Sequence, residues 1–121
     1  MRAAGKKVAL VVEDEALIRA EIVSEFCRRG WAVVDTGSGE KALDLARDNY
    51  FDVVFTDIKL SGPLQGWDVA ERLRSSGRRI PFVYASGNAG HRSRRVAGSL
   101  FFDKPYSSEA VVRACERLVS T

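Results

Sequence analysis

Three kinds of polar side chain that can act on a phosphoryl group occur along this sequence: carboxylates, a hydroxyl and a lysine. Each follows an apolar run of the kind that forms buried strands. The residues are Glu13, Asp14, Asp57, Ser86 and Lys104. Carboxylates held close together repel one another, so we expect a hard divalent cation, Mg²⁺ or Mn²⁺, to join them.

Asp57 is the residue that we predict to react. It ends the segment 51–57, whose Val and Phe residues show no polar alternation, as in a central parallel strand covered on both faces. With a metal ion bound, an aspartate can attack a phosphoryl group while Lys104 offsets the charge that develops on the oxygens. A hydroxyl at Ser86 can donate a hydrogen bond to the same group. The plainer alternative is that Asp57 only starts a turn.

The apolar pattern predicts strands that alternate with helices. We expect strands over 7–12, 31–35, 51–57, 80–85 and 100–102, and helices over 16–29, 38–46, 67–75 and 107–119, with a weak Arg-rich turn of helix over 91–97. Five such units in succession imply an α/β fold with a parallel sheet and helices on both faces. The carboxyl ends of its strands would bring the polar residues into one crevice.

The composition is that of an ordinary globular domain. A chain of 121 residues, 45% hydrophobic and 29% charged, suits one domain. No apolar segment is long enough to span a bilayer, and the start of the chain does not resemble a signal peptide, so we expect a cytoplasmic protein. Cys27 and Cys115 lie among apolar neighbours without metal or redox spacing, and we predict that both are reduced core residues.

Taken in order, these residues resemble the receiver domain of two-component response regulators, over about residues 7–119. The resemblance rests on Glu13-Asp14, Asp57, Ser86 and Lys104-Pro105. It implies a flavodoxin-like doubly wound sheet of strand order 2-1-3-4-5, with a fourth helix that is short or mobile. It also implies that a histidine kinase or phosphotransfer protein phosphorylates the aspartate.

The same resemblance implies a metal site and a structural proline. Mg²⁺ would be bound by Asp14, Asp57 and the backbone carbonyl of Lys59, with Glu13 helping through water. Pro105 would form a cis peptide with the preceding lysine. The only catalysis implied is the domain's own phosphorylation and dephosphorylation, as in a signalling domain that is not otherwise an enzyme.

Two departures from the family pattern concern the loop after Asp57 and the switch. The loop lacks an early proline and takes a longer path to Gly66. The segment 82–87 is similar to that of a single-domain receiver subgroup named for a Phe-Ala-Thr-Gly motif. Phe101 stands at the aromatic switch position but has no hydroxyl. We therefore expect the switch to involve Ser86 and Phe101 through ordering of residues 87–98, rather than through rotation of one tyrosine.

The chain ends soon after the last predicted helix, so we expect a single receiver domain, 1–121, without an output domain, direct DNA binding or membrane attachment. Output would run through a protein partner, and we expect Arg92, Arg94 and Arg95 on the partner face; a solvated face is the plainer reading of these arginines. A phosphate sink, docking without phosphorylation and a homodimer remain open. His91 is expected to be a surface residue.

Two other classes of function are weighed against this one. An aspartyl-nucleophile phosphatase resembling the haloacid dehalogenases needs a second Asp two residues after the first, where this chain has Lys59. A flavin or dinucleotide module needs a Gly-rich turn after the first strand. The acidic residues 13–15 stand there instead and would repel a pyrophosphate.

Overall fold

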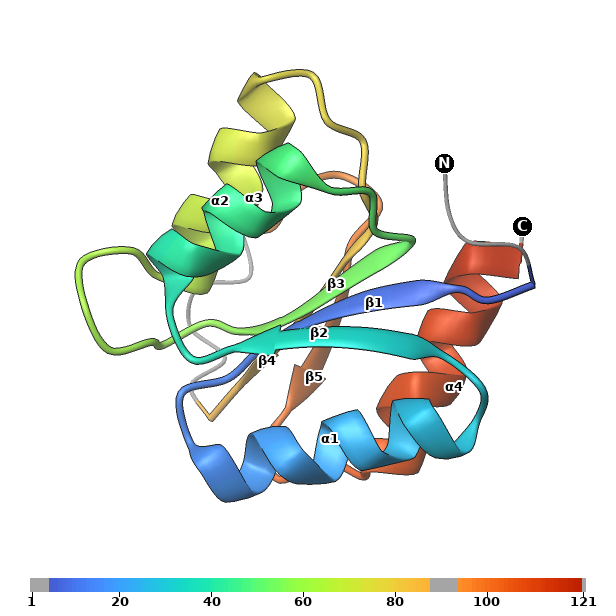
Figure 1. The fold of residues 1–121 in the computed structure, drawn as a ribbon. Coiled ribbons are helices and arrows are strands. Elements are labelled where there is room, and N and C mark those ends of the chain that lie inside the picture. Colours follow the sequence, from blue (N-terminus) through green and yellow to red (C-terminus); the bar gives the residue numbers. More distant parts are fainter. Residues whose placement is uncertain (1–4, 88–93, 121) are drawn as a thin grey trace.

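The computed structural model describes residues 5–87 and 94–120 (Figure 1). One parallel sheet contains β1 (Val8–Val12), β2 (Ala32–Thr36), β3 (Val53–Asp57), β4 (Phe82–Ser86) and β5 (Leu100–Asp103). Their order is β2-β1-β3-β4-β5, as predicted. The strands lie within two residues of the predicted ranges.

Helices cover both faces of the sheet. They are α1 (Ala16–Arg28), α2 (Gly39–Asp48), α3 (Gly66–Ser75) and α4 (Ser108–Ser120). In Figure 1, α2 and α3 lie on one face and α1 and α4 on the other. The described residues contain no α-helix between β4 and β5, and residues 91–93 of the weak turn predicted over 91–97, which include His91, lie outside them.

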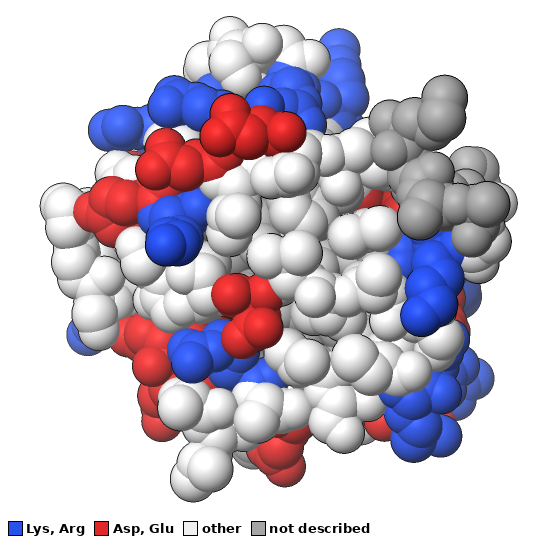
Figure 2. Space-filling model, viewed as in Figure 1, with Lys and Arg blue, Asp and Glu red and all other residues white. Residues whose placement is uncertain are grey.

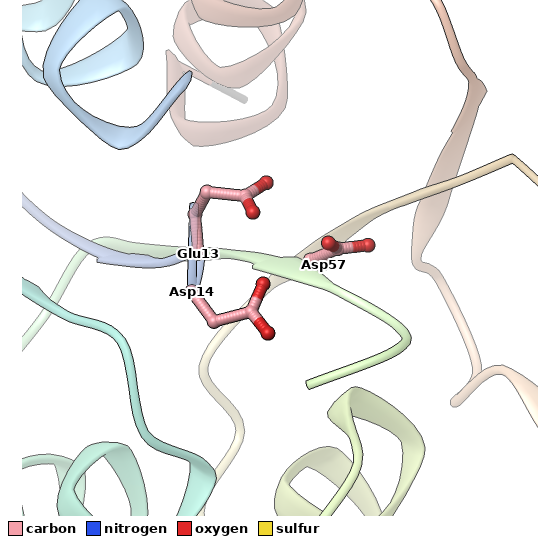
Figure 3. A group of neighbouring side chains, drawn as sticks. All are labelled: Glu13, Asp14 and Asp57. Atoms are coloured by element: carbon pink, nitrogen blue, oxygen red, sulfur yellow. The ribbon is translucent and has the colours of Figure 1, made fainter. Parts of the chain in front are cut away.

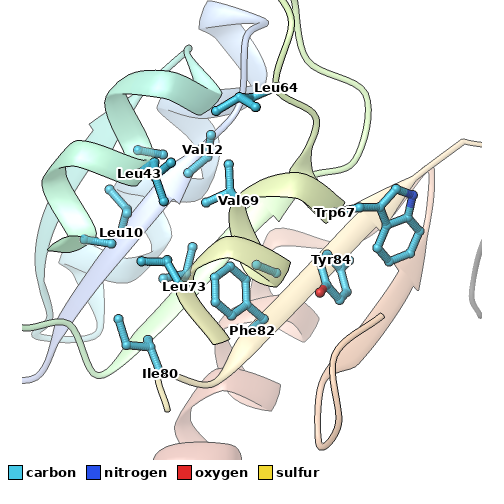
Figure 4. Close-up of a cluster of buried hydrophobic side chains, with 14 of the residues drawn as sticks. Leu10, Val12, Leu43, Leu64, Trp67, Val69, Leu73, Ile80, Phe82 and Tyr84 are labelled. Atoms are coloured by element: carbon cyan, nitrogen blue, oxygen red, sulfur yellow. The ribbon is translucent and has the colours of Figure 1, made fainter. Parts of the chain in front are cut away.

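The unbroken apolar runs in the central strands form two separate cores, one on each face. Successive side chains of a strand point to opposite faces, so Leu10 packs under α2 and α3 whereas Val11 packs under α1 and α4. Figure 4 shows the first core, in which Trp67 is buried. In the second, Phe26 meets Trp31 edge to face with 5.0 Å between ring centroids, so both are core residues.

One cysteine is placed differently from the prediction. Cys115 is buried in α4, but Cys27 is exposed on α1. Phe26 takes the inward position in that last turn, and the next residue of a helix points about 100° away from it. Apolar neighbours in the sequence therefore did not imply an inward position. None of the described helices has the length and apolar character needed to cross a membrane.

Candidate functional site

The ends of two neighbouring strands bring three carboxylates together (Figure 3). Val12 of β1 pairs with Thr56 of β3, so the residues that follow Val12 stand beside the residue that ends β3. One carboxylate oxygen from each of Glu13, Asp14 and Asp57 lies within 4.8 Å of the others. Glu13 is fully buried, and Asp57 is only 4% exposed. The juxtaposition predicted from the sequence is therefore present.

Lys104 lies at the end of β5 and supplies the positive charge of the site. Its Nζ is 2.9 Å from Asp57 Oδ2 and 3.8 Å from Glu13 Oε1. Its backbone N–H donates to the carbonyl of Ser86, at 2.9 Å, which ties the ends of β4 and β5 together. The peptide bond from Lys104 to Pro105 is cis, as the resemblance implied.

A contact that sequence reasoning missed holds Asp14. Both the backbone N–H and the hydroxyl of Ser61 donate to Asp14 Oδ2, at 3.0 and 2.8 Å. Ser61 belongs to the loop between β3 and α3, 47 residues away in the chain. The long path from Asp57 to Gly66 was the available signal, but it did not indicate which loop residue would reach the carboxylate.

The three carboxyl groups have different affinities for protons. Burial raises the pKa of Glu13 from 4.5 to about 7. Burial also raises the pKa of Asp57, although the hydrogen bond from Lys104 opposes it. For Asp14 partial burial acts upward, but the hydrogen bonds from Ser61 outweigh it and lower the pKa. Burial therefore destabilises the charged forms of Glu13 and Asp57.

The donor set fits a hard divalent cation. All the side-chain donors are carboxylate oxygens, which Mg²⁺ prefers. Glu13 Oε1 is buried and has no hydrogen-bond partner among the described residues, so a cation or its water would satisfy it. Such an ion would also relieve the repulsion among the three carboxylates.

In the absence of Mg²⁺ and at about pH 8, replacing Glu13 with Gln is expected to raise the free energy of unfolding by about 1–3 kcal/mol. The folded-state pKa of Glu13, about 7, lies above its ordinary 4.5, so the folded state binds this proton more tightly than the unfolded state. The free energy of unfolding of the wild type should thus fall as the pH rises from 4.5 to about 7. The difference between the two proteins should appear in the same pH range.

Urea unfolding at a series of pH values measures this difference. Glu109→Gln removes the same charge from α4, where the side chain is 59% exposed, and should leave the pH profile nearly unchanged. Saturating Mg²⁺ should narrow the gap between wild type and Glu13→Gln. A variant that is less stable than wild type at every pH would contradict the prediction.

A surface pocket opens over Asp57. It is lined by Asp14, Glu15, Asp57, Lys59, Leu60, Ser61, Ser86, Gly87 and Lys104. Residues predicted to take part in the chemistry thus meet in one concavity at the carboxyl edge of the sheet. The side chain of Lys59 is exposed, so the predicted involvement of its backbone carbonyl does not require that side chain to enter the site.

Comparison with known proteins agrees with this geometry. Residues 9–116 match the family model described as the response regulator receiver domain. The chain belongs to this family. A response regulator receiver protein from Sinorhizobium medicae has a similar structure, with a TM-score of 0.90, 30% identity and 98% of each chain covered. The family match and the structural similarity confirm the family and the fold that were predicted from the sequence. Receiver domains of two-component systems are signalling domains.

Other relatives of this receiver domain differ in length or identity. The transcriptional regulatory protein PdtaR of Mycobacterium tuberculosis is 30% identical over 98% of this chain, which covers 59% of PdtaR. The chain spans about half the length of the curated relatives it matches. The fold is shared with the receiver domain of the Pseudomonas aeruginosa sensor histidine kinase PA1611, whose structure has a magnesium ion in its active-site cleft. The TM-score is 0.83 at 24% identity, and the match covers 97% of this chain and all of that one.

Phe101, which the sequence predicted as part of the switch, belongs to an aromatic cluster. Phe101 stacks against Trp67, with 6.1 Å between ring centroids, and lies 6.5 Å from Tyr84. The buried Tyr84 hydroxyl accepts a hydrogen bond from the backbone N–H of Val96, at 3.2 Å. Tyr84 precedes Ser86 by two positions in β4, so both point to the same face. Sequence analysis did not identify this contact of Tyr84.

The arginines of the predicted partner face are not all free for a partner. Arg94 Nη2 lies 2.8 Å from Glu71 and 3.3 Å from Asp68, both on α3. Arg95 is exposed, and Arg92 lies outside the described residues. In the view of Figure 2, basic side chains form more than one group with acidic side chains between them. The basic side chains seen in that view therefore do not form a single patch.

Proposed function

We propose that this receiver domain accepts a phosphoryl group on Asp57 from a histidine kinase or phosphotransfer protein, in a Mg²⁺-dependent reaction, and signals through contacts with other proteins. The observation that carries the proposal is the 2.9 Å ion pair between Lys104 and Asp57, set beside the carboxylates of Glu13 and Asp14. The pair places a cation beside the oxygen that would receive the phosphoryl group.

In this proposal the residues of the chain divide the work. A carboxylate oxygen of Asp57 forms a bond to phosphorus as the bond from phosphorus to the donor breaks. Lys104 then binds an oxygen of the transferred group. Asp14, Asp57 and the carbonyl of Lys59 would hold Mg²⁺, with Glu13 acting through water, and the ion would neutralise negative charge on the phosphoryl oxygens.

Signalling would begin at the end of β4. Ser86 is 7% exposed and lines the pocket, so its hydroxyl can reach toward a phosphoryl group on Asp57. Movement of Ser86 would act on Tyr84 in the same strand, and through the Tyr84 hydroxyl on the backbone at Val96. Phe101 would follow as part of the aromatic cluster. We therefore favour a change in the segment after β4 over rotation of a single ring.

The same site supports weaker alternatives for output. A phosphate sink would use Asp57 in the same way but without a partner for the phosphorylated form. Docking without phosphorylation would leave the ion pair of Lys104 and Asp57 without a role. For an aspartyl phosphatase, the exposed Lys59 stands where the second aspartate would be needed. Dephosphorylation would instead be the slow hydrolysis of the domain's own acyl phosphate.

Incubation with acetyl phosphate should give a gain of one phosphoryl group in the intact mass of wild-type protein. The gain should require Mg²⁺ and should disappear when a chelator is added first. Reduction with borohydride followed by peptide mapping should place the acyl phosphate at residue 57. No gain from acetyl phosphate or from a panel of histidine kinases would contradict the proposal.

A further inference from the structure

The loop that leads from β3 to α3 reaches back to the carboxylates at the end of β1. In Figure 3 the side chains of Glu13 and Asp14 point to opposite sides of that strand end. On the Asp14 side, Ser61 donates two hydrogen bonds to the same oxygen, Oδ2. The serine therefore fixes the direction of this carboxylate and leaves its other oxygen, Oδ1, outside these two bonds.

One side chain holds the loop in this shape. Gln65 Oε1 accepts from the backbone N–H of Leu60, at 2.8 Å. Gln65 Nε2 donates to the carbonyls of Leu60 and Gly62, at 3.2 and 3.3 Å. These bonds enclose Ser61 on both sides. The amide side chain thus holds the loop backbone on both sides of the serine.

The two ends of the loop are also anchored. Leu60 and Leu64 are buried in the core under α2 and α3. The backbone N–H of Gln65 donates to Asp68 Oδ2 at 2.8 Å, which fixes the start of α3. Gly62 has a φ of +94°, a conformation that favours glycine and lets the chain turn after Ser61. Since little of the loop is free to shift, Ser61 occupies a defined place.

We infer that Ser61 is a positioning residue that orients Asp14 for a divalent cation, and that Gln65 acts through Ser61 by holding the loop. The inference rests on the proposed function, because the cation is the one proposed above. Groups that hydrogen-bond to a metal ligand orient it, and their loss commonly lowers metal affinity about 10- to 100-fold. The same reasoning makes the long loop part of the metal site.

Titration calorimetry with MgCl₂ tests the inference on the unphosphorylated protein. Ser61→Ala is expected to raise the dissociation constant for Mg²⁺ about 10-fold. Ser61→Thr keeps the hydroxyl and should restore most of the affinity. The matched control is Ser76→Ala, which removes a hydroxyl bonded to the carbonyl of Leu73 at the far end of α3 and should leave the affinity unchanged.

A double-mutant cycle tests whether Gln65 acts through the serine. Gln65→Met keeps the length of the side chain and removes all three of its loop hydrogen bonds, so it should also weaken Mg²⁺ binding. The combination with Ser61→Ala should weaken binding little more than Ser61→Ala alone, because the two residues act on one ligand. Fully additive losses would overturn the link from Gln65 to Ser61.

The outcomes separate this inference from the proposed function. If wild type binds Mg²⁺ and Ser61→Ala binds it equally well or more tightly, the positioning role is wrong and the proposed function stands. If wild type takes up no Mg²⁺, the proposed metal chemistry fails as well. Circular dichroism and thermal melting of each variant establish that a loss of affinity comes from a folded protein.

Discussion

Replacing Asp57 with Asn is expected to abolish phosphorylation, with a fall in rate of at least about 10³-fold. Asn fills nearly the same space at the end of β3 but lacks the carboxylate oxygen that would attack phosphorus. The substitution also removes the negative charge that pairs with Lys104 at 2.9 Å. Intact mass after incubation with acetyl phosphate and Mg²⁺ measures the result.

The control for this variant is another aspartate at the carboxyl edge of the sheet. Asp35 lies in β2, and its side chain is 43% exposed and paired with Arg19 at 3.0 Å. Asp35→Asn should accept the phosphoryl group at the wild-type rate. An undiminished gain of mass in Asp57→Asn would place the phosphoryl group on a different residue and overturn the assignment of the acceptor.

Replacing Gly66 with Ala is expected to destabilise the protein by about 3 kcal/mol or more, at the upper end of the usual cost of overpacking. A Cβ on Gly66 would lie 2.3 Å from the carbonyl oxygen of Asp57 and 3.0 Å from the Cα of Ile58. Both are backbone atoms, so no side chain can rotate away. Either α3 or the end of β3, which carries Asp57, would have to move.

Thermal unfolding measures this effect as a fall in Tm of about 10 °C or more. Gly87→Ala is the control, because a Cβ at Gly87 would meet no atom within 4 Å in the part of the chain that the structure describes. It should leave Tm nearly unchanged although Gly87 lines the pocket over Asp57. If Gly66→Ala were as stable as wild type, the close packing of the first turn of α3 on β3 would be wrong.

The parts of the fold that could be predicted depend on patterns within short segments. The apolar runs of β1 and β3 indicated buried parallel strands, and the order of the units led to the sheet. Because such strands end at one edge, the grouping of Glu13, Asp14 and Asp57 followed from their positions in the sequence. Their grouping is confirmed, whereas their roles in binding and transfer stay predictions.

Contacts between distant segments could not be predicted in this way. The bonds from Ser61 to Asp14 depend on the path of a loop with no periodic pattern. The pairing of Arg94 with Glu71 joins residues 23 positions apart and uses an arginine that looked available to a partner. Cys27 was misplaced because apolar neighbours show that a helix has a buried side but leave its rotation open.

The aromatic cluster also gives the protein an optical reporter of its own. Trp67 directly follows Gly66, which lies against the carbonyl of Asp57, and its ring contacts Tyr84 and Phe101. The second tryptophan, Trp31, is buried in the core on the opposite face of the sheet. In a Trp31→Phe background, the single remaining indole would emit from beside the residues proposed as acceptor and switch. Its fluorescence would follow events at Asp57 in real time without an attached dye.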